Sequence, residues 1–390
     1  MKTKIYQLLS IALLSILGFS NLYAQSDTSA PFVNSPAGGA KKFMLPGSAV
    51  AMHQFINTQG SGSTHSFSPI GIMMMPLVKI DNLLLDCGVN FGMNPDGSMN
   101  AGLVELIVYY KVTPWLSVFA GNFPPHYGVY SGILDDFTNR FGTGVAPVGM
   151  GHGVQGQNGV GIQGGVQAGY SKFTYQLYMA NGPQLIVDTV TVGSNNQTGK
   201  MDYGTIIDNN KNKSFGGHIG FLPLSNSNLE VTASGQYTPE TGLEGTNYQK
   251  VKCAAWALGL NYFHLFNPMM VRVIAEYNQI NTGDASYMDP ETHQYYTFKN
   301  QETGWFAGAT VRAAGSHSWL LKNMEFAGRV GAYTPPKSGA LWGGTPTNQT
   351  TFCLTEYLKW DIPLSFEYDI ITQSGAPTQK IFSSIIFFRF

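Results

Sequence analysis

Two glycine-rich stretches are the clearest candidates for chemistry in this sequence. GHGVQG (151–156) and GVGIQG (159–164) both match the glycine spacing of a dinucleotide-binding loop. Such a loop follows a strand, opens a helix and has an acidic residue about 20 positions further on, and neither stretch has this context. We therefore expect no nucleotide there. Gly161, Gln163 and Gly165 are better interpreted as one row of a strand.

Other catalytic and metal-binding patterns are missing from the sequence. It contains no HExxH, P-loop, CxxC or GxSxG motif. The histidines have no serine in an evident nucleophile elbow beside them, and they are scattered: His126, His152, His218 and His264. The cysteines fit small apolar fillers rather than disulfides or metal ligands: Cys87, Cys253 and Cys353. We expect no catalytic residue, no metal and no cofactor, and hence no enzyme.

Most of the chain consists of short segments in which apolar and polar residues alternate. In residues 268–280, for example, Val271, Val273 and Ala275 alternate with Arg272 and Glu276. Successive side chains of a strand point to opposite faces, so each segment predicts a strand with one apolar and one polar face. About sixteen such segments follow Gly47, among them 66–78, 83–93 and 319–333. Pro69 and Pro76 disturb the segment at 66–78.

The gaps between these segments alternate between short and long. Short periplasmic turns and long external loops produce this rhythm in transmembrane barrels. Aromatic residues gather beside the short gaps, where a lipid–water boundary favours them. A soluble β-sandwich also alternates, but the regular succession of hairpins shows no Greek-key excursion. We predict an all-β fold: a closed antiparallel up-and-down transmembrane barrel over residues 47–390.

The C-terminal stretch KIFSSIIFFRF (380–390) resembles the last strand of outer-membrane β-barrels, which commonly ends in phenylalanine. The resemblance implies a porin-like barrel whose last strand is recognised by the barrel-assembly machinery. WLSVFAGNFPPHYG (115–128) is similar to a segment of phosphate-selective-type porins. Phosphate selectivity would require a ladder of Arg and Lys, which the sequence does not show.

If alternation assigns the faces correctly, acids and bases in nearly equal number line the lumen of such a barrel. A mixed wall excludes no ion strongly and predicts weak selectivity. The predicted wall residues are Glu105, Lys111, Arg272, Glu276, Arg312, Glu325, Arg329, Glu367 and Asp369.

Residues 124–157 form the third long gap, longer than a connection between two strands requires. By position it resembles the loop of general porins that folds inward and narrows the channel. That resemblance makes Asp135, Asp136 and Arg140 candidates for a constriction, facing bases such as Arg312 and Arg329. The alternative is an outward loop that caps the barrel or packs on a neighbouring subunit.

The start of the chain predicts export. Lys2 and Lys4 precede an apolar stretch, and Ala24 offers a small residue for cleavage, so residues 1–24 fit a signal peptide. Residues 25–46 fit a flexible periplasmic lead-in. Charged residues make up only 12% of the chain and the net charge is −1, which gives no reason to expect nucleic acid.

We therefore expect an outer-membrane porin that passes small hydrophilic solutes and ions, surrounded by outer-membrane lipid. The general-porin resemblance alone implies a homotrimer. The alternatives are a non-conducting barrel that serves as scaffold, adhesin or secretion-assembly subunit, and a transporter of apolar molecules.

Overall fold

The computed structural model describes most of the predicted barrel. The described residues are 42–93, 98–129, 156–187, 201–202, 212–226, 228–246, 248–288, 293, 295–335, 345–358 and 362–389. The predicted signal peptide (1–24), most of the lead-in and residues 130–155 of the long third loop lie outside them.

The described residues form strands and one short helix. The elements are β1 (Lys42–Met44), β2 (Gly47–Thr58), β3 (Gly62–Met74), β4 (Leu77–Ile80), β5 (Leu83–Met93), β6 (Met99–Thr113), β7 (Leu116–Phe123), β8 (Gln157–Ala168), β9 (Ser171–Ala180), β10 (Gln184–Leu185), β11 (Met201–Asp202), β12 (Ser214–Leu222), β13 (Leu229–Thr238), β14 (Cys253–Phe266), β15 (Met269–Met288), β16 (Tyr295–Arg312), α2 (Trp319–Asn323), β17 (Met324–Thr334), β18 (Thr347–Tyr357), β19 (Pro363–Gln373) and β20 (Gln379–Arg389).

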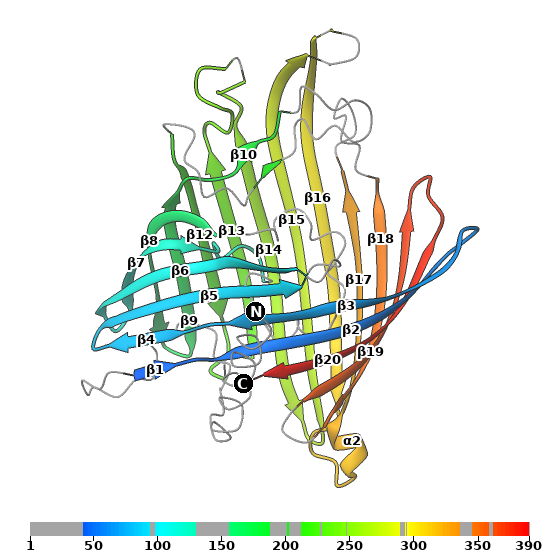
Figure 1. The fold of residues 1–390 in the computed structure, drawn as a ribbon. Coiled ribbons are helices and arrows are strands. Elements are labelled where there is room, and N and C mark those ends of the chain that lie inside the picture. The colour runs from blue at the N-terminus through cyan, green and yellow to red at the C-terminus, as the bar shows by residue number, and fades with distance from the viewer. Residues whose placement is uncertain are drawn as a thin grey trace.

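Sixteen long antiparallel strands close into a barrel, as predicted (Figure 1). The strands pair in chain order, and β20 closes the ring by pairing with β2, where Phe382 lies opposite Phe55. Because the strands pair antiparallel in chain order, short turns such as 81–82 and 267–268 lie at the same end of the barrel as α2. At the opposite end the β15–β16 hairpin rises above its neighbours (Figure 1).

β1 and β4 extend the first two long strands beyond proline breaks at Pro46 and Pro76. β1 pairs with β4, and the N–H of Met75 donates to the carbonyl of Pro46 across the break. The interruption expected at Pro76 is therefore observed, because proline cannot donate to a ladder. The lead-in prediction differs from the structure at Lys42–Met44, which finds a strand partner in β4.

One predicted strand start is wrong. Residues 319–333 were expected to be extended throughout, but Trp319–Asn323 form α2. β16 ends at Arg312, so these residues have no ladder partner opposite them. A helical turn satisfies the backbone instead, and the N–H of Lys322 donates to the carbonyl of Ser318.

The two faces of each strand differ in the way alternation predicts. In β17 the outward Phe326 is 54% exposed and Val330 is 42% exposed, whereas Glu325 and Arg329 are 1% and 3% exposed. The same contrast holds along β13, β15 and β19. Rows of exposed Leu, Phe and Val around a closed sheet are what hydrocarbon requires, since a barrel leaves no unpaired edge. The polar rows face the interior.

Candidate functional site: the barrel interior

The chain leaves the wall after β7 and turns into the barrel. We call residues 124–129 the inward segment. Three of its backbone N–H groups donate to side chains of the inner wall: His126 to Gln176 Oε1 at 2.9 Å, Gly128 to Ser234 Oγ at 2.7 Å and Val129 to Glu276 Oε2 at 2.8 Å. These acceptors stand on β9, β13 and β15, so the segment crosses the inner faces of several strands.

Two glycines allow this close approach. Gly128 has a positive φ of +70°, and a Cβ there would lie 2.1 Å from Glu276 Oε2. Gly259 lies between Thr232 and Glu276 in the β13–β14–β15 register. A Cβ at Gly259 would lie 2.2 Å from Val129 Cγ1. The absence of a side chain at Gly259 therefore leaves the space that Val129 fills, and we call this space the seat.

Apolar contacts hold the segment on both sides of this seat. Val129 packs against a cluster on the inner faces of β15–β18 that includes Ile274 and Phe306. Tyr127 packs in a second cluster with Leu185 of β10 and Met201 of β11, so that short hairpin also lies against the inner wall. Burial, and then the charge of Glu276, raises the pKa of the Tyr127 phenol well above its ordinary value. Its hydroxyl is therefore neutral.

Neutral amides and hydroxyls line the wall from β7 to β13. Gln157 and Gln236 exchange hydrogen bonds, and the Tyr178 hydroxyl donates to Gln236 Oε1 at 3.1 Å. Gln176 Nε2 donates to Gln163 Oε1 at 3.3 Å. We call this the amide wall. Its side chains largely satisfy one another, which is the condition for burying polar groups at low cost.

Charged residues line the wall from β15 to β19, which we call the ionic wall. Arg329 donates from Nη2 to Thr351 Oγ1 at 3.4 Å, and Thr351 donates to Asp369 Oδ1 at 2.5 Å. Gln349 donates to the same carboxylate at 3.1 Å. Glu276 accepts from Asn278 Nδ2 at 2.9 Å and from the inward segment.

The predicted wall residues occupy the inner face, but at different heights. Glu105, Glu276, Glu367, Asp369 and Arg329 are buried well inside their strands, and Glu325 is buried near a strand start. Lys111, Arg272 and Arg312 lie close to the short turns.

Arg312 does not lie where the constriction hypothesis needs it. Its guanidinium lies 4.3 Å from the ring centroid of Tyr357, and its Nε donates to the carbonyl of Lys322 in α2. Of the two bases expected to face the loop, only Arg329 lies deep in the barrel, because Arg312 is the last residue of β16. Asp135, Asp136 and Arg140 lie outside the described residues.

Sequence reasoning missed the groups that anchor the segment. Gln176 and Ser234 carry no charge, and nothing in their spacing distinguishes them from other lumen-facing polar residues. The second glycine motif, by contrast, was interpreted correctly: Gly159–Gly164 lie within β8 and no helix follows. Gly161 leaves space for the Phe119 ring, because a Cβ there would lie 2.4 Å from Phe119 Cζ.

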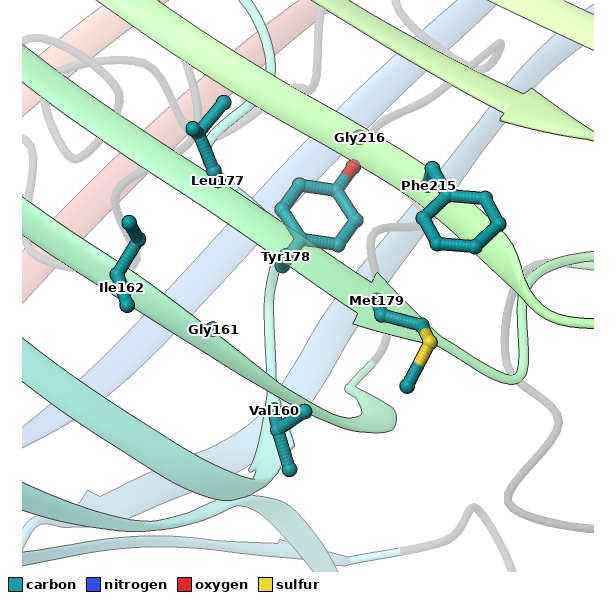
Figure 2. A pocket seen from close by; sticks show the side chains of 8 residues that line it. All are labelled: Val160, Gly161, Ile162, Leu177, Tyr178, Met179, Phe215 and Gly216. Atoms are coloured by element: carbon teal, nitrogen blue, oxygen red, sulfur yellow. The ribbon is translucent and has the colours of Figure 1, made fainter.

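A shallow hollow on β8, β9 and β12 lies on the outer wall and is no solute site. Figure 2 shows Ile162, Leu177, Met179 and Phe215 around it, all exposed and apolar. The Tyr178 hydroxyl points toward Gly216 in the same view. The hollow belongs to the lipid-facing surface.

Within the described ranges, no three His, Cys, Asp or Glu side chains are grouped as metal ligands. The described part of the chain also has no helix that is long and apolar enough to cross a membrane.

Solved structures share this architecture at low sequence identity. The anion-selective porin from Comamonas acidovorans aligns with a TM-score of 0.56 and 12% identity, over 90% of this chain and 100% of that one. The outer membrane channel DcaP of Acinetobacter baumannii aligns with a TM-score of 0.55 and 10% identity, over 90% and 97%. A loop L8 deletion mutant of OmpT, an outer membrane protein of Vibrio cholerae, aligns with a TM-score of 0.51 and 12% identity, over 90% of this chain and 100% of that one. No family model and no curated relative matches the chain. The fold of this chain is that of the outer-membrane porins.

Proposed function

We propose that this protein is an outer-membrane porin that lets small hydrophilic solutes and ions diffuse through its barrel. One observation carries the proposal: a closed ring of strands is apolar outside, polar inside and crossed by a segment anchored to the inner wall. Two of the aligned structures are themselves described as a porin and a channel. Diffusion through such a barrel requires no catalytic residue and no cofactor.

The inward segment supports a constriction formed by the third loop. Its anchors bring the chain to the inner face of β15, six residues before Asp135. Asp135, Asp136 and Arg140 would then narrow the channel opposite the ionic wall, with Arg329 rather than Arg312 as the facing base.

The proposal also includes the route to the membrane. A signal peptide directs export, the barrel-assembly machinery recognises the last strand with Phe390, and the barrel is inserted in outer-membrane lipid. Assembly as a homotrimer belongs to it through the general-porin resemblance. Native mass measurement of the detergent-extracted protein tests that assembly, and a monomeric mass would remove the trimer from the proposal.

The experiment is conductance in a planar bilayer. We expect the wild-type protein to give stable, nearly ohmic steps. Gly259→Phe places a ring where Val129 sits and should displace the inward segment, raising the conductance by roughly twofold because the constriction opens. Gly235→Phe is the matched control, since it adds the same ring to the outward face of β13 and should leave the conductance unchanged.

A non-conducting barrel is the second candidate, and one observation favours it. Inner-wall residues such as Glu367, Asp369 and Thr351 are fully buried in this conformation. A folded barrel that stays silent in the bilayer, both as wild type and as Gly259→Phe, would favour a scaffold, adhesin or secretion-assembly role over a porin.

A further inference from the structure

The charged residues of the inner wall are sorted along the strands. Five of the described wall bases lie within three residues of the strand end at a short turn: Lys79, Lys111, Lys172, Arg272 and Arg312. Three acids share that end: Asp86, Glu230 and Glu325. Deeper in the barrel, the described wall carries four acids, Glu105, Glu276, Glu367 and Asp369, and one base, Arg329. Glu302 lies at the far end of the wall, one residue beyond the last pair between β16 and β17.

This sorting changes the expectation of weak selectivity. A count over the whole wall is nearly balanced, but an ion in the narrow part of a channel responds to the nearest charges, which are screened least there. Among the described residues, acids outnumber bases in this part of the wall, and one of these acids contacts the inward segment. Glu276 lies at this contact, because its carboxylate accepts the N–H of Val129.

A second, independent observation is a set of buried oxygens without a hydrogen-bond partner near Glu276. Asn278 turns its Nδ2 toward Glu276 Oε1, and its Oδ1 has no hydrogen-bond partner among the described residues. The Thr232 Oγ1, across Gly259 from Glu276, and the Tyr127 hydroxyl also have none. All three residues are more than nine-tenths buried. Buried polar groups of this kind require a partner. The hydroxyls can donate or accept, but the Asn278 Oδ1 can only accept, so it requires water, a cation or a donor group of a solute.

Building on the proposed function, we infer that the channel prefers cations to anions and that Glu276 is its specificity-determining residue. The carboxylate supplies the negative charge at the inward segment. The oxygens of Asn278, Thr232 and Tyr127 replace part of the hydration shell of a metal cation, or accept hydrogen bonds from the ammonium group of a solute.

The test is the reversal potential in a KCl gradient across a planar bilayer. We expect the wild-type channel to favour K⁺ over Cl⁻. Glu276→Gln keeps an acceptor for the Val129 N–H but removes the charge, so the K⁺/Cl⁻ permeability ratio should fall by roughly twofold or more. Asp369→Asn, which removes a charge from β19 of the ionic wall without changing the size of the side chain, should also lower the ratio.

Glu230→Gln is the matched control, because it removes one charge near a short turn, where bases are abundant. It should change the ratio much less than Glu276→Gln. A wild-type channel that conducts without preference, or prefers Cl⁻, would overturn the inference and leave the porin proposal standing. An equal loss in Glu230→Gln and Glu276→Gln would remove the special role of Glu276. Absence of any conductance contradicts the proposed function itself.

Discussion

The amide wall and the ionic wall hold the same inward segment by different means. The amide wall offers neutral acceptors, Gln176 and Ser234, to His126 and Gly128. The ionic wall offers the carboxylate of Glu276 to Val129. A hydrogen bond to an ionised acceptor is roughly twice as strong as a neutral one, so the ionic wall carries the firmer anchor.

The two walls also differ in how they tolerate burial. Amides can donate and accept at once, so Gln157 and Gln236 satisfy each other without any charge. On the ionic wall, Arg329 is the one base placed deep among several acids in the described strands. The difference teaches that most of the amide wall is a structural lining, whereas the charges of the ionic wall are costly to bury and are therefore the first place to seek function.

Arg329→Met should have the largest effect on stability. The substitution removes the base that links through Thr351 to Asp369 and leaves buried acids around it. We expect a loss of about 3 kcal/mol in the free energy of unfolding, measured by urea titration of the barrel in lipid vesicles. Arg329→Lys, which keeps the charge, is the control and should lose less. Equal stability of the wild type, Arg329→Met and Arg329→Lys would contradict a stabilising link from Arg329 through Thr351 to Asp369.

Glu276→Ala should have an intermediate and local effect. It removes the acceptor of the Val129 N–H, a charge-assisted bond worth about 1.5–3 kcal/mol. Hydrogen exchange at Val129 should accelerate accordingly, while exchange in β18 stays unchanged. Ser234→Ala, which removes the neutral acceptor of the Gly128 N–H, should accelerate exchange less. The reverse order would show that the neutral anchor holds the segment.

Gln236→Leu should have the smallest effect of the three. It breaks the two hydrogen bonds between the side chains of Gln236 and Gln157 and removes the acceptor of the Tyr178 hydroxyl, but it leaves no charge unbalanced. We expect the free energy of unfolding to fall by about 1 kcal/mol, measured by the same urea titration. A loss as large as that of Arg329→Met would mean that the amide wall, too, depends on a single critical group.

Much of the fold could be predicted from alternation, because a barrel strand shows its two faces directly in the sequence. Leu83–Met93 was predicted with the observed bounds, and the outward Val271 and Val273 oppose Arg272 as expected. Alternation fails where the ladder ends. Trp319–Asn323 continue the apolar character of a strand, but no partner strand lies opposite them because β16 ends at Arg312. The end of β16 cannot be read from the alternation within 319–323.

The interior was less predictable than the wall. Alternation assigns a face but no height, so Arg312 and Arg329 looked equivalent although one lies beside α2 and the other deep in the barrel. The seat at Gly259 also escaped prediction. It exists only because Val129, far away in sequence, fills the space above it, and a single glycine in a strand carries no such signal.

Disulfide trapping between positions 129 and 259 tests the central arrangement most directly. The Val129 Cβ lies 3.2 Å from the Cβ position at Gly259, within a few tenths of an ångström of the range that a disulfide spans. In a background with Cys87, Cys253 and Cys353 replaced by alanine, V129C/G259C should crosslink nearly completely in the membrane-inserted barrel. V129C/L258C, whose second cysteine faces outward, should not crosslink. The conductance of the crosslinked channel should equal that of its reduced form. Failure of V129C/G259C to crosslink, or crosslinking only with loss of conductance, would contradict a conducting barrel whose inward segment rests on β14 and β15.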